Sequence, residues 1–130
     1  AGAIVLQPFG NVMRSILVAV YELNAEEVCV IGHHECGMTG LDPNKLVNKM
    51  QQKGIKEETF EILKNAGINL NTWLKGFDNP EEGVKNSVEI IRKHPLLPPN
   101  VPVHGLLIHP ETGQLDWIVN GYLEKGMSAQ

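Results

Sequence analysis

Val28-Cys29-Val30-Ile31-Gly32-His33-His34-Glu35-Cys36-Gly37-Met38-Thr39-Gly40 joins a continuous apolar run to a loop rich in histidine, cysteine and glycine. The apolar part, 28–31, is typical of a strand that is covered on both faces. The glycine-punctuated part, 32–40, follows at the carboxyl end of that strand. Open α/β sheets build their binding sites at this position, so the stretch predicts both a parallel sheet and a candidate site.

The segments on either side of this strand alternate between extended and helical patterns. An apolar run at 3–6 predicts a short buried strand, and apolar residues at helical spacing predict a helix over 12–23. Strand, helix and strand in this order imply a right-handed parallel crossover. Extended segments at 103–109 and 115–119 flank a turn and predict a late antiparallel hairpin.

Helix-capping residues mark the starts of most of the predicted helices. Asn11 is expected to cap the helix over 12–23. Further helices are predicted over 43–52 (begun by Asp42 and Pro43), 57–65, 70–75 and 81–93 (begun by Asp78 or Asn79 with Pro80), and a polar tail or short helix over 122–130. Together these elements predict an α/β fold, a mostly parallel sheet flanked by helices, with one late antiparallel strand.

Length and composition narrow the class of protein. The 130 residues fit a single domain spanning 1–130, and 42% apolar with 20% charged residues favours a globular chain over a disordered one. The net charge of −4 argues against a nucleic-acid partner, and no apolar stretch approaches the ~20 residues of a membrane span. Because Cys29 and Cys36 lie seven positions apart with no secretory signal before them, we expect no disulfide framework and a soluble cytoplasmic protein.

His33 and Cys36 are the strongest chemical signal in the chain. An imidazole and a thiolate three residues apart, just past a strand, can bend onto one cation at zinc distances of about 2.0–2.3 Å. One alternative is structural, a solvent-exposed loop histidine beside a half-buried free cysteine. Another uses the same pair as a cysteine nucleophile with its base, although no specific motif supports it.

A zinc site needs a third ligand, and the sequence offers none that is convincing. Cys29 lies about 13 Å from His33 along an extended strand, and its apolar neighbours predict a packed core thiol. His34 points away from His33 wherever the chain is extended. We expect structural roles for the other histidines. His94 lies at the end of a predicted helix, where a positive charge interacts favourably with the helix dipole. His104 and His109 flank an apolar strand.

These residues resemble a known family. The stretch from Val30 to Met38 closely resembles the zinc loop of β-class carbonic anhydrases. Residues 1–5 are similar to the end of the family's Arg-Asn-Ala-Gly segment, 11–17 to its following helix and 105–108 to its late strand. The resemblance covers nearly the whole chain, is most specific over residues 1–40, and indicates the smaller prokaryotic branch of the family.

The resemblance implies reversible hydration of carbon dioxide to bicarbonate at a Zn²⁺ ion held by cysteine, histidine and cysteine, in a homodimer or higher homo-oligomer. His33 and Cys36 match the second and third ligands, and Glu35 stands where the family usually has aspartate. The first ligand, with the family's catalytic aspartate and arginine, belongs to a Cys-x-Asp-x-Arg motif that is not in this sequence. No catalytic residue is therefore assigned.

The missing motif leaves several interpretations open. We expect an N-terminally truncated fragment that lacks a helix and the central strand of the family's sheet, and that is active only with the missing segment. A degenerate paralogue whose partner strand comes from another chain is the alternative. On function, the alternatives are hydrolysis of carbon disulfide or carbonyl sulfide in the same fold, and a non-catalytic, zinc-poor scaffold acting through its dimer surface.

Overall fold

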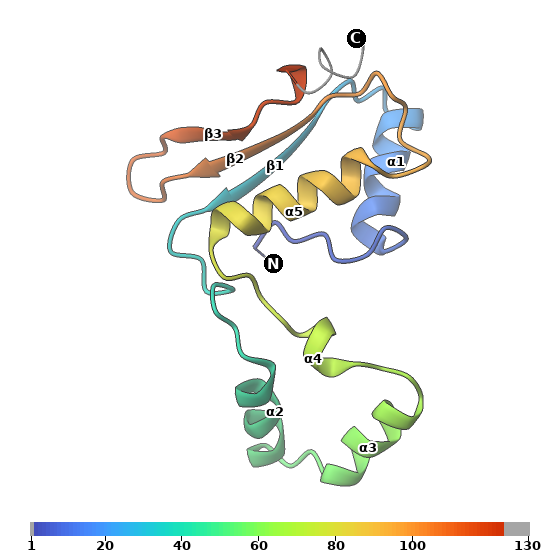
Figure 1. Cartoon of the computed structure of the whole chain (residues 1–130), viewed down its shortest axis with the longest axis vertical. Helices are drawn as coiled ribbons and strands as arrows, with labels where there is room; N and C mark the ends of the chain where they lie inside the picture. Colours follow the sequence, from blue (N-terminus) through green and yellow to red (C-terminus); the bar gives the residue numbers. More distant parts are fainter. Residues whose placement is uncertain (1, 124–130) are drawn as a thin grey trace.

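The computed structural model describes residues 2–123, which form a three-stranded sheet with helices (Figure 1). In chain order the elements are α1 (Asn11–Glu22), β1 (Val28–His33), α2 (Pro43–Gln52), α3 (Glu57–Asn65), α4 (Leu70–Trp73), α5 (Pro80–Arg92), β2 (Val103–Ile108) and β3 (Leu115–Val119). The helices and the late hairpin are close to the predicted ranges. Most of the tail predicted over 122–130 lies outside the described residues.

The sheet has the strand order β1-β2-β3 and is mixed. β1 and β2 are parallel, with Val28 opposite Val103. β2 and β3 are antiparallel, with Ile108 opposite Leu115. The predicted α/β fold with a late antiparallel strand is confirmed, but within residues 2–123 the sheet has one parallel and one antiparallel pair rather than being mostly parallel.

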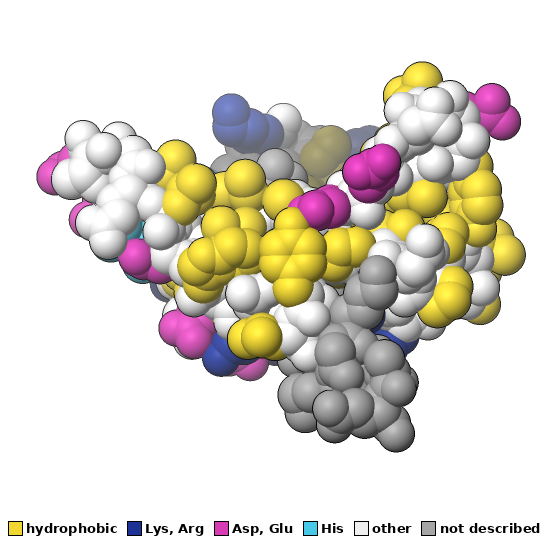
Figure 2. Space-filling model, turned by 90° about the horizontal axis from the view of Figure 1, so that it is seen from above, with side chains coloured by type: hydrophobic (Ala, Val, Ile, Leu, Met, Phe, Trp, Pro, Cys, Tyr) yellow, Lys and Arg dark blue, Asp and Glu magenta, His cyan; other side chains and the backbone are white. Residues whose placement is uncertain are grey.

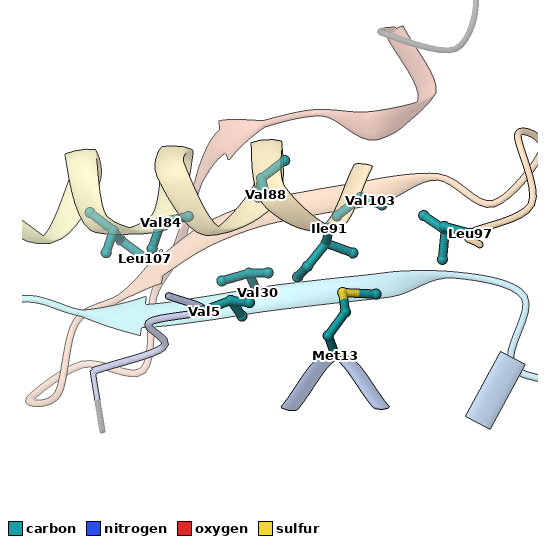
Figure 3. Packing of buried hydrophobic residues seen from close by; sticks show 9 residues of the cluster. All are labelled: Val5, Met13, Val30, Val84, Val88, Ile91, Leu97, Val103 and Leu107. Carbon is teal, nitrogen blue, oxygen red and sulfur yellow. The ribbon is translucent and has the colours of Figure 1, made fainter. Parts of the chain in front are cut away.

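Helix α5 covers one face of this sheet and supplies much of the core (Figure 3). Val84, Val88 and Ile91 form its buried stripe, at the spacing of an amphipathic helix. Gly32 of β1 and Gly105 of β2 both lie directly against Val84. A Cβ atom on Gly32 would be 2.8 Å from a Val84 methyl carbon, and one on Gly105 would be 2.7 Å from the other. The two glycines therefore set the close approach of α5 to the sheet.

The segment before α1 joins the core without becoming a strand. Val5 is buried with Met13 of α1 and Val30 of β1 (Figure 3). The buried Ser87 hydroxyl of α5 accepts a hydrogen bond from the Val5 N–H and donates one to the Ala3 carbonyl oxygen, both at 2.9 Å. The strand predicted at 3–6 is wrong, because no strand of the described chain lies beside it to pair with its backbone.

Helices α2, α3 and α4 lie apart from the sheet, below it in Figure 1, and none of them has a fully buried residue. The predicted caps Asp42 of α2 and Asn79 of α5 each accept a backbone N–H bond, at 2.9 and 2.8 Å. At α1 the cap is Gly10, so the capping role predicted for Asn11 is wrong. No helix in residues 2–123 is long and apolar enough to cross a bilayer.

The sheet face away from α5 is largely open and apolar within the described part of the chain. Ile31, Leu115 and Trp117 are 48, 47 and 55% exposed, and hydrophobic side chains form a band across the face shown in Figure 2. Cys29 is also exposed, so the prediction of a packed core thiol is wrong. Side chains alternate between the two faces of a strand. Val30 and Gly32 are the buried residues of β1 and face α5, so Cys29 faces the open side.

Candidate functional site

The loop after β1 carries both predicted zinc ligands and is anchored by Phe77. The Gly40 N–H donates to the Phe77 carbonyl oxygen at 2.8 Å, and the Phe77 N–H donates to the Met38 carbonyl oxygen at 3.3 Å. Phe77 is buried, and a Cβ on Gly83 of α5 would lie 2.6 Å from its ring. The loop is therefore fixed to the first turn of α5, which itself packs on the sheet.

His33 ends β1 and has one ring nitrogen committed to the backbone. Its Nδ1 lies 2.8 Å from the His34 carbonyl oxygen, which can only accept, so Nδ1 carries the proton. In the neutral ring, Nε2 then holds the lone pair that a metal needs. Backbone carbonyls fix metal-binding histidines in the same way in zinc sites.

Cys36 is the other predicted ligand, and it is buried, with 7% of its surface exposed. Imidazole nitrogen and thiolate sulfur are the donors that Zn²⁺ prefers, so the chemistry of this pair fits the ion. Within residues 2–123, no third His, Cys, Asp or Glu completes a compact set with His33 and Cys36. The loop thus offers two suitable donors and an incomplete site.

The structure brings together a different group at the neighbouring position, His34, His109 and Asp116. Their ligand atoms all lie within 4.8 Å of one another. His109 Nε2 hydrogen-bonds to Asp116 Oδ2 at 2.7 Å, His34 Nε2 lies 3.7 Å from the same oxygen, and the two rings stack with centroids 4.1 Å apart. The hydrogen bond from His109 holds the pKa of Asp116 below its ordinary value.

The sequence pattern does not predict this group, because it gives His109 a structural role and points His34 away from His33. The predicted hairpin was a signal that could have placed His109 near Asp116. Nothing local indicates that His34 joins them, because its position depends on the parallel register of β1 and β2.

Two other histidines make structural contacts, and for His94 the contact differs from the predicted role of a cation at the helix end. His104 is 1% exposed, its Nδ1 accepts from the Gly121 N–H at 3.0 Å and its Nε2 therefore donates to Glu27, also at 3.0 Å. The Tyr122 hydroxyl donates to Glu27 at 2.6 Å, which lowers the Glu27 pKa and raises the pKa of Tyr122. His94 is buried at the end of α5, where its Nδ1 accepts from the backbone N–H of residue 96 at 3.1 Å.

Comparison with known proteins gives consistent matches. The family model described as carbonic anhydrase matches residues 1–115. A Bacillus subtilis (strain 168) protein named "Putative carbonic anhydrase YvdA" is 59% identical over 122 residues, which cover 94% of this chain and 62% of that protein. A protein named "Carbon disulfide hydrolase" from Acidithiobacillus thiooxidans is 30% identical over 112 residues, covering 81% of this chain and 56% of that protein.

A solved structure agrees with these matches. The β-carbonic anhydrase isoform I of Trichomonas vaginalis superposes with a TM-score of 0.83 at 41% identity, covering 94% of this chain and 66% of that one. The chain spans less than two thirds of the length of the curated relatives that it matches. With the family model covering most of its length, and the same fold in a solved member, this chain belongs to the β-class carbonic anhydrase family.

Proposed function

We propose that this chain forms part of a zinc-dependent carbonic anhydrase, which hydrates carbon dioxide reversibly to bicarbonate, with His33 and Cys36 as two of the zinc ligands. The observation that carries the proposal is the hydrogen bond from His33 Nδ1 to the His34 carbonyl oxygen, which leaves Nε2 free to ligate. The buried thiol of Cys36 follows on the same anchored loop.

The missing ligand belongs, in this proposal, to residues outside the 130 or to a second chain. The support is the donor set itself, since two suitable donors lie three residues apart on one loop and no described residue completes them. The activity is therefore a property of the longer protein, in line with the part of its relatives that this chain covers.

Zinc, when bound, supplies the Lewis acidity that lets water act as a nucleophile near neutral pH. The residues of this chain hold the donors in place. The His34 carbonyl oxygen fixes the tautomer of His33, and the backbone bonds between Phe77 and the loop restrict its movement. Burial keeps bulk water away from the Cys36 sulfur.

Hydrolysis of carbon disulfide is the second candidate. It is favoured by the 30% identity to the Acidithiobacillus thiooxidans protein of that name. Carbon dioxide takes precedence because the relative named after carbonic anhydrase is 59% identical. Both substrates are small linear molecules, so access to the site rather than ligand identity separates the two reactions.

A homodimer or higher homo-oligomer is part of the proposal. Ile31, Leu115 and Trp117 support it, because they leave an apolar sheet face exposed. Sedimentation that gives a monomeric mass would contradict it. The two free cysteines fit a reducing compartment, and we propose a cytoplasmic location.

Cobalt(II) titration of the 130-residue chain and of the longer protein tests the site. Cobalt bound to a thiolate gives a charge-transfer absorption that nitrogen and oxygen ligands do not give. We expect this absorption in the longer protein, its loss in Cys36→Ser, and its retention in Cys29→Ser. Carbon dioxide hydration and carbon disulfide hydrolysis are then measured on the zinc forms of the same samples.

Each result has a defined meaning. Loss of the absorption in both variants, or in neither, would overturn the ligand assignment. A longer protein without thiolate-bound metal and without either activity would leave the alternative, a zinc-poor scaffold that acts through its oligomer surface.

A further inference from the structure

We propose that His34, His109 and Asp116 form a second divalent metal site, separate from His33 and Cys36, which ties together the ends of the three strands. His34 directly follows β1, His109 directly follows β2, and Asp116 is the second residue of β3. The His34 N–H donates to the Ile108 carbonyl oxygen at 3.2 Å and extends the parallel ladder past the strands. This bond sets His34 beside His109.

The second group lies on the opposite face of the sheet from His33. Asp116 is opposite Leu107 in the hairpin, and Leu107 is buried in the core on the α5 side. Alternation along β1 puts Gly32 on that side and His33 on the other, so the next residue, His34, returns to the α5 side. The two candidate sites therefore use separate donors and separate faces.

The distances suit a small transition-metal ion. Tetrahedral zinc at about 2.0–2.1 Å from each ligand separates the ligand atoms by about 3.4 Å. His109 Nε2 and Asp116 Oδ2 are closer than this, at 2.7 Å, and His34 Nε2 is slightly farther from the same oxygen, at 3.7 Å. All the ligand atoms lie within 4.8 Å of one another, so the proposal requires the side chains to rotate toward a common ion, which would replace the proton between His109 and Asp116.

His34 Nε2 is the independent sign of a missing partner. This nitrogen is buried although the His34 side chain as a whole is 37% exposed, and the Asp116 oxygen at 3.7 Å lies beyond hydrogen-bond distance from it. A buried nitrogen without a hydrogen bond is unfavourably desolvated, and an ion at this position would satisfy it.

The surrounding residues hold the other two ligands. Gln114 Nε2 donates to Asp116 Oδ1 at 3.2 Å, which leaves Oδ2 directed at the histidines. The His109 N–H donates to the Gln114 carbonyl oxygen at 2.9 Å, and the Gly113 N–H donates to the His109 carbonyl oxygen at 2.8 Å. Outer hydrogen bonds of this kind orient the ligands of metal sites.

The donor set indicates which ions would bind. Two imidazoles and one carboxylate suit Zn²⁺, Co²⁺, Ni²⁺ and Cu²⁺, and are poor ligands for Mg²⁺ and Ca²⁺, which prefer oxygen. The three side chains are each more than a third exposed, so water completes the coordination.

Metal titration in a Cys36→Ser background tests this site without thiolate binding. Zn²⁺ is titrated by calorimetry and Co²⁺ by absorption, using the full chain. We expect one equivalent of metal, a cobalt spectrum without thiolate charge transfer, and a rise in melting temperature with zinc. Adding His109→Ala should weaken binding by at least about tenfold, since even the loss of an outer partner costs that much.

Two further variants complete the design. His34→Ala should weaken binding in the same way, and it serves as the readout if His109→Ala does not fold. Glu111→Gln removes a carboxylate from the same hairpin turn outside the group and should bind as the background does. No binding in Cys36→Ser, or binding that neither histidine variant weakens, would overturn the second site and would leave the proposed function untouched.

Discussion

Gly76 lies so close to Met38 that a Cβ atom on the glycine would stand 1.9 Å from the Met38 carbonyl oxygen. The same carbonyl accepts the N–H of Phe77, the residue that anchors the loop. Gly76→Ala should therefore push the two backbones apart and lower the free energy of unfolding by about 1–3 kcal/mol, as overpacking does. Thermal and urea unfolding measure this loss.

Gly37→Ala is the matched control for this change. A Cβ on Gly37 meets nothing within 4 Å, so its effect should stay within about 0.5 kcal/mol. Equal losses in the two variants would contradict the close approach at Gly76.

Ser87 is expected to hold the N-terminal segment on α5. Ser87→Ala removes the partner of both the Val5 N–H and the Ala3 carbonyl oxygen. We expect a loss of about 1–3 kcal/mol in the free energy of unfolding and faster proteolytic cleavage before α1. Ser15→Ala, which removes an exposed hydroxyl bonded only to the Asn11 carbonyl, should change neither.

The Glu27 carboxylate predicts a pH-dependent contribution to stability. The hydrogen bond from Tyr122 lowers the Glu27 pKa below its ordinary value of 4.5, so the folded state favours the charged form. The stabilisation is complete above pH 4.5 and is lost as the pH falls through the lowered pKa. Glu27→Gln should therefore be less stable than the parent at neutral pH, and the difference should shrink below pH 4.5.

Urea unfolding at a series of pH values measures this difference. Glu26→Gln removes the neighbouring exposed carboxylate and is the matched control for the change of side chain. A Glu27→Gln difference that stays constant into strong acid would show that the carboxylate charge contributes nothing.

The two cysteines should differ in reactivity. Cys29 is exposed and Cys36 is buried, so an alkylating reagent should modify Cys29 first, as mass spectrometry of peptides would show. In the longer protein, zinc should protect Cys36 and leave Cys29 reactive. Alkylation of Cys36 that zinc does not slow would favour the cysteine-nucleophile alternative over metal ligation.

Local signals predicted most of the elements correctly. Asp42 with Pro43, and Asn79 with Pro80, begin α2 and α5 as expected, because caps act within a single turn. The loop after β1 is also where the sequence places it. These features depend only on residues close together in the chain, so they can be predicted from a single sequence.

Features that depend on distant partners were not predicted. The apolar run at 3–6 has the composition of a strand, but its neighbour is α5 rather than another strand. Cys29 has apolar neighbours, yet only one face of β1 is covered by the described residues. His34 meets His109 only through the register of β1 on β2, which no local pattern contains.

The pairing of Val28 with Val103 also bears on how the chain folds. These partners are 75 positions apart, while β2 and β3 pair across a short turn. Bringing β1 and β2 together restricts the long stretch of chain between them, and this loss of chain entropy comes before any contact of β1 with β2 can offset it. Parallel pairing is therefore slow. We expect the β2–β3 hairpin and α5 to assemble first and β1 to dock last, which makes the loop bearing His33 and Cys36 the final part of the chain to reach its native geometry.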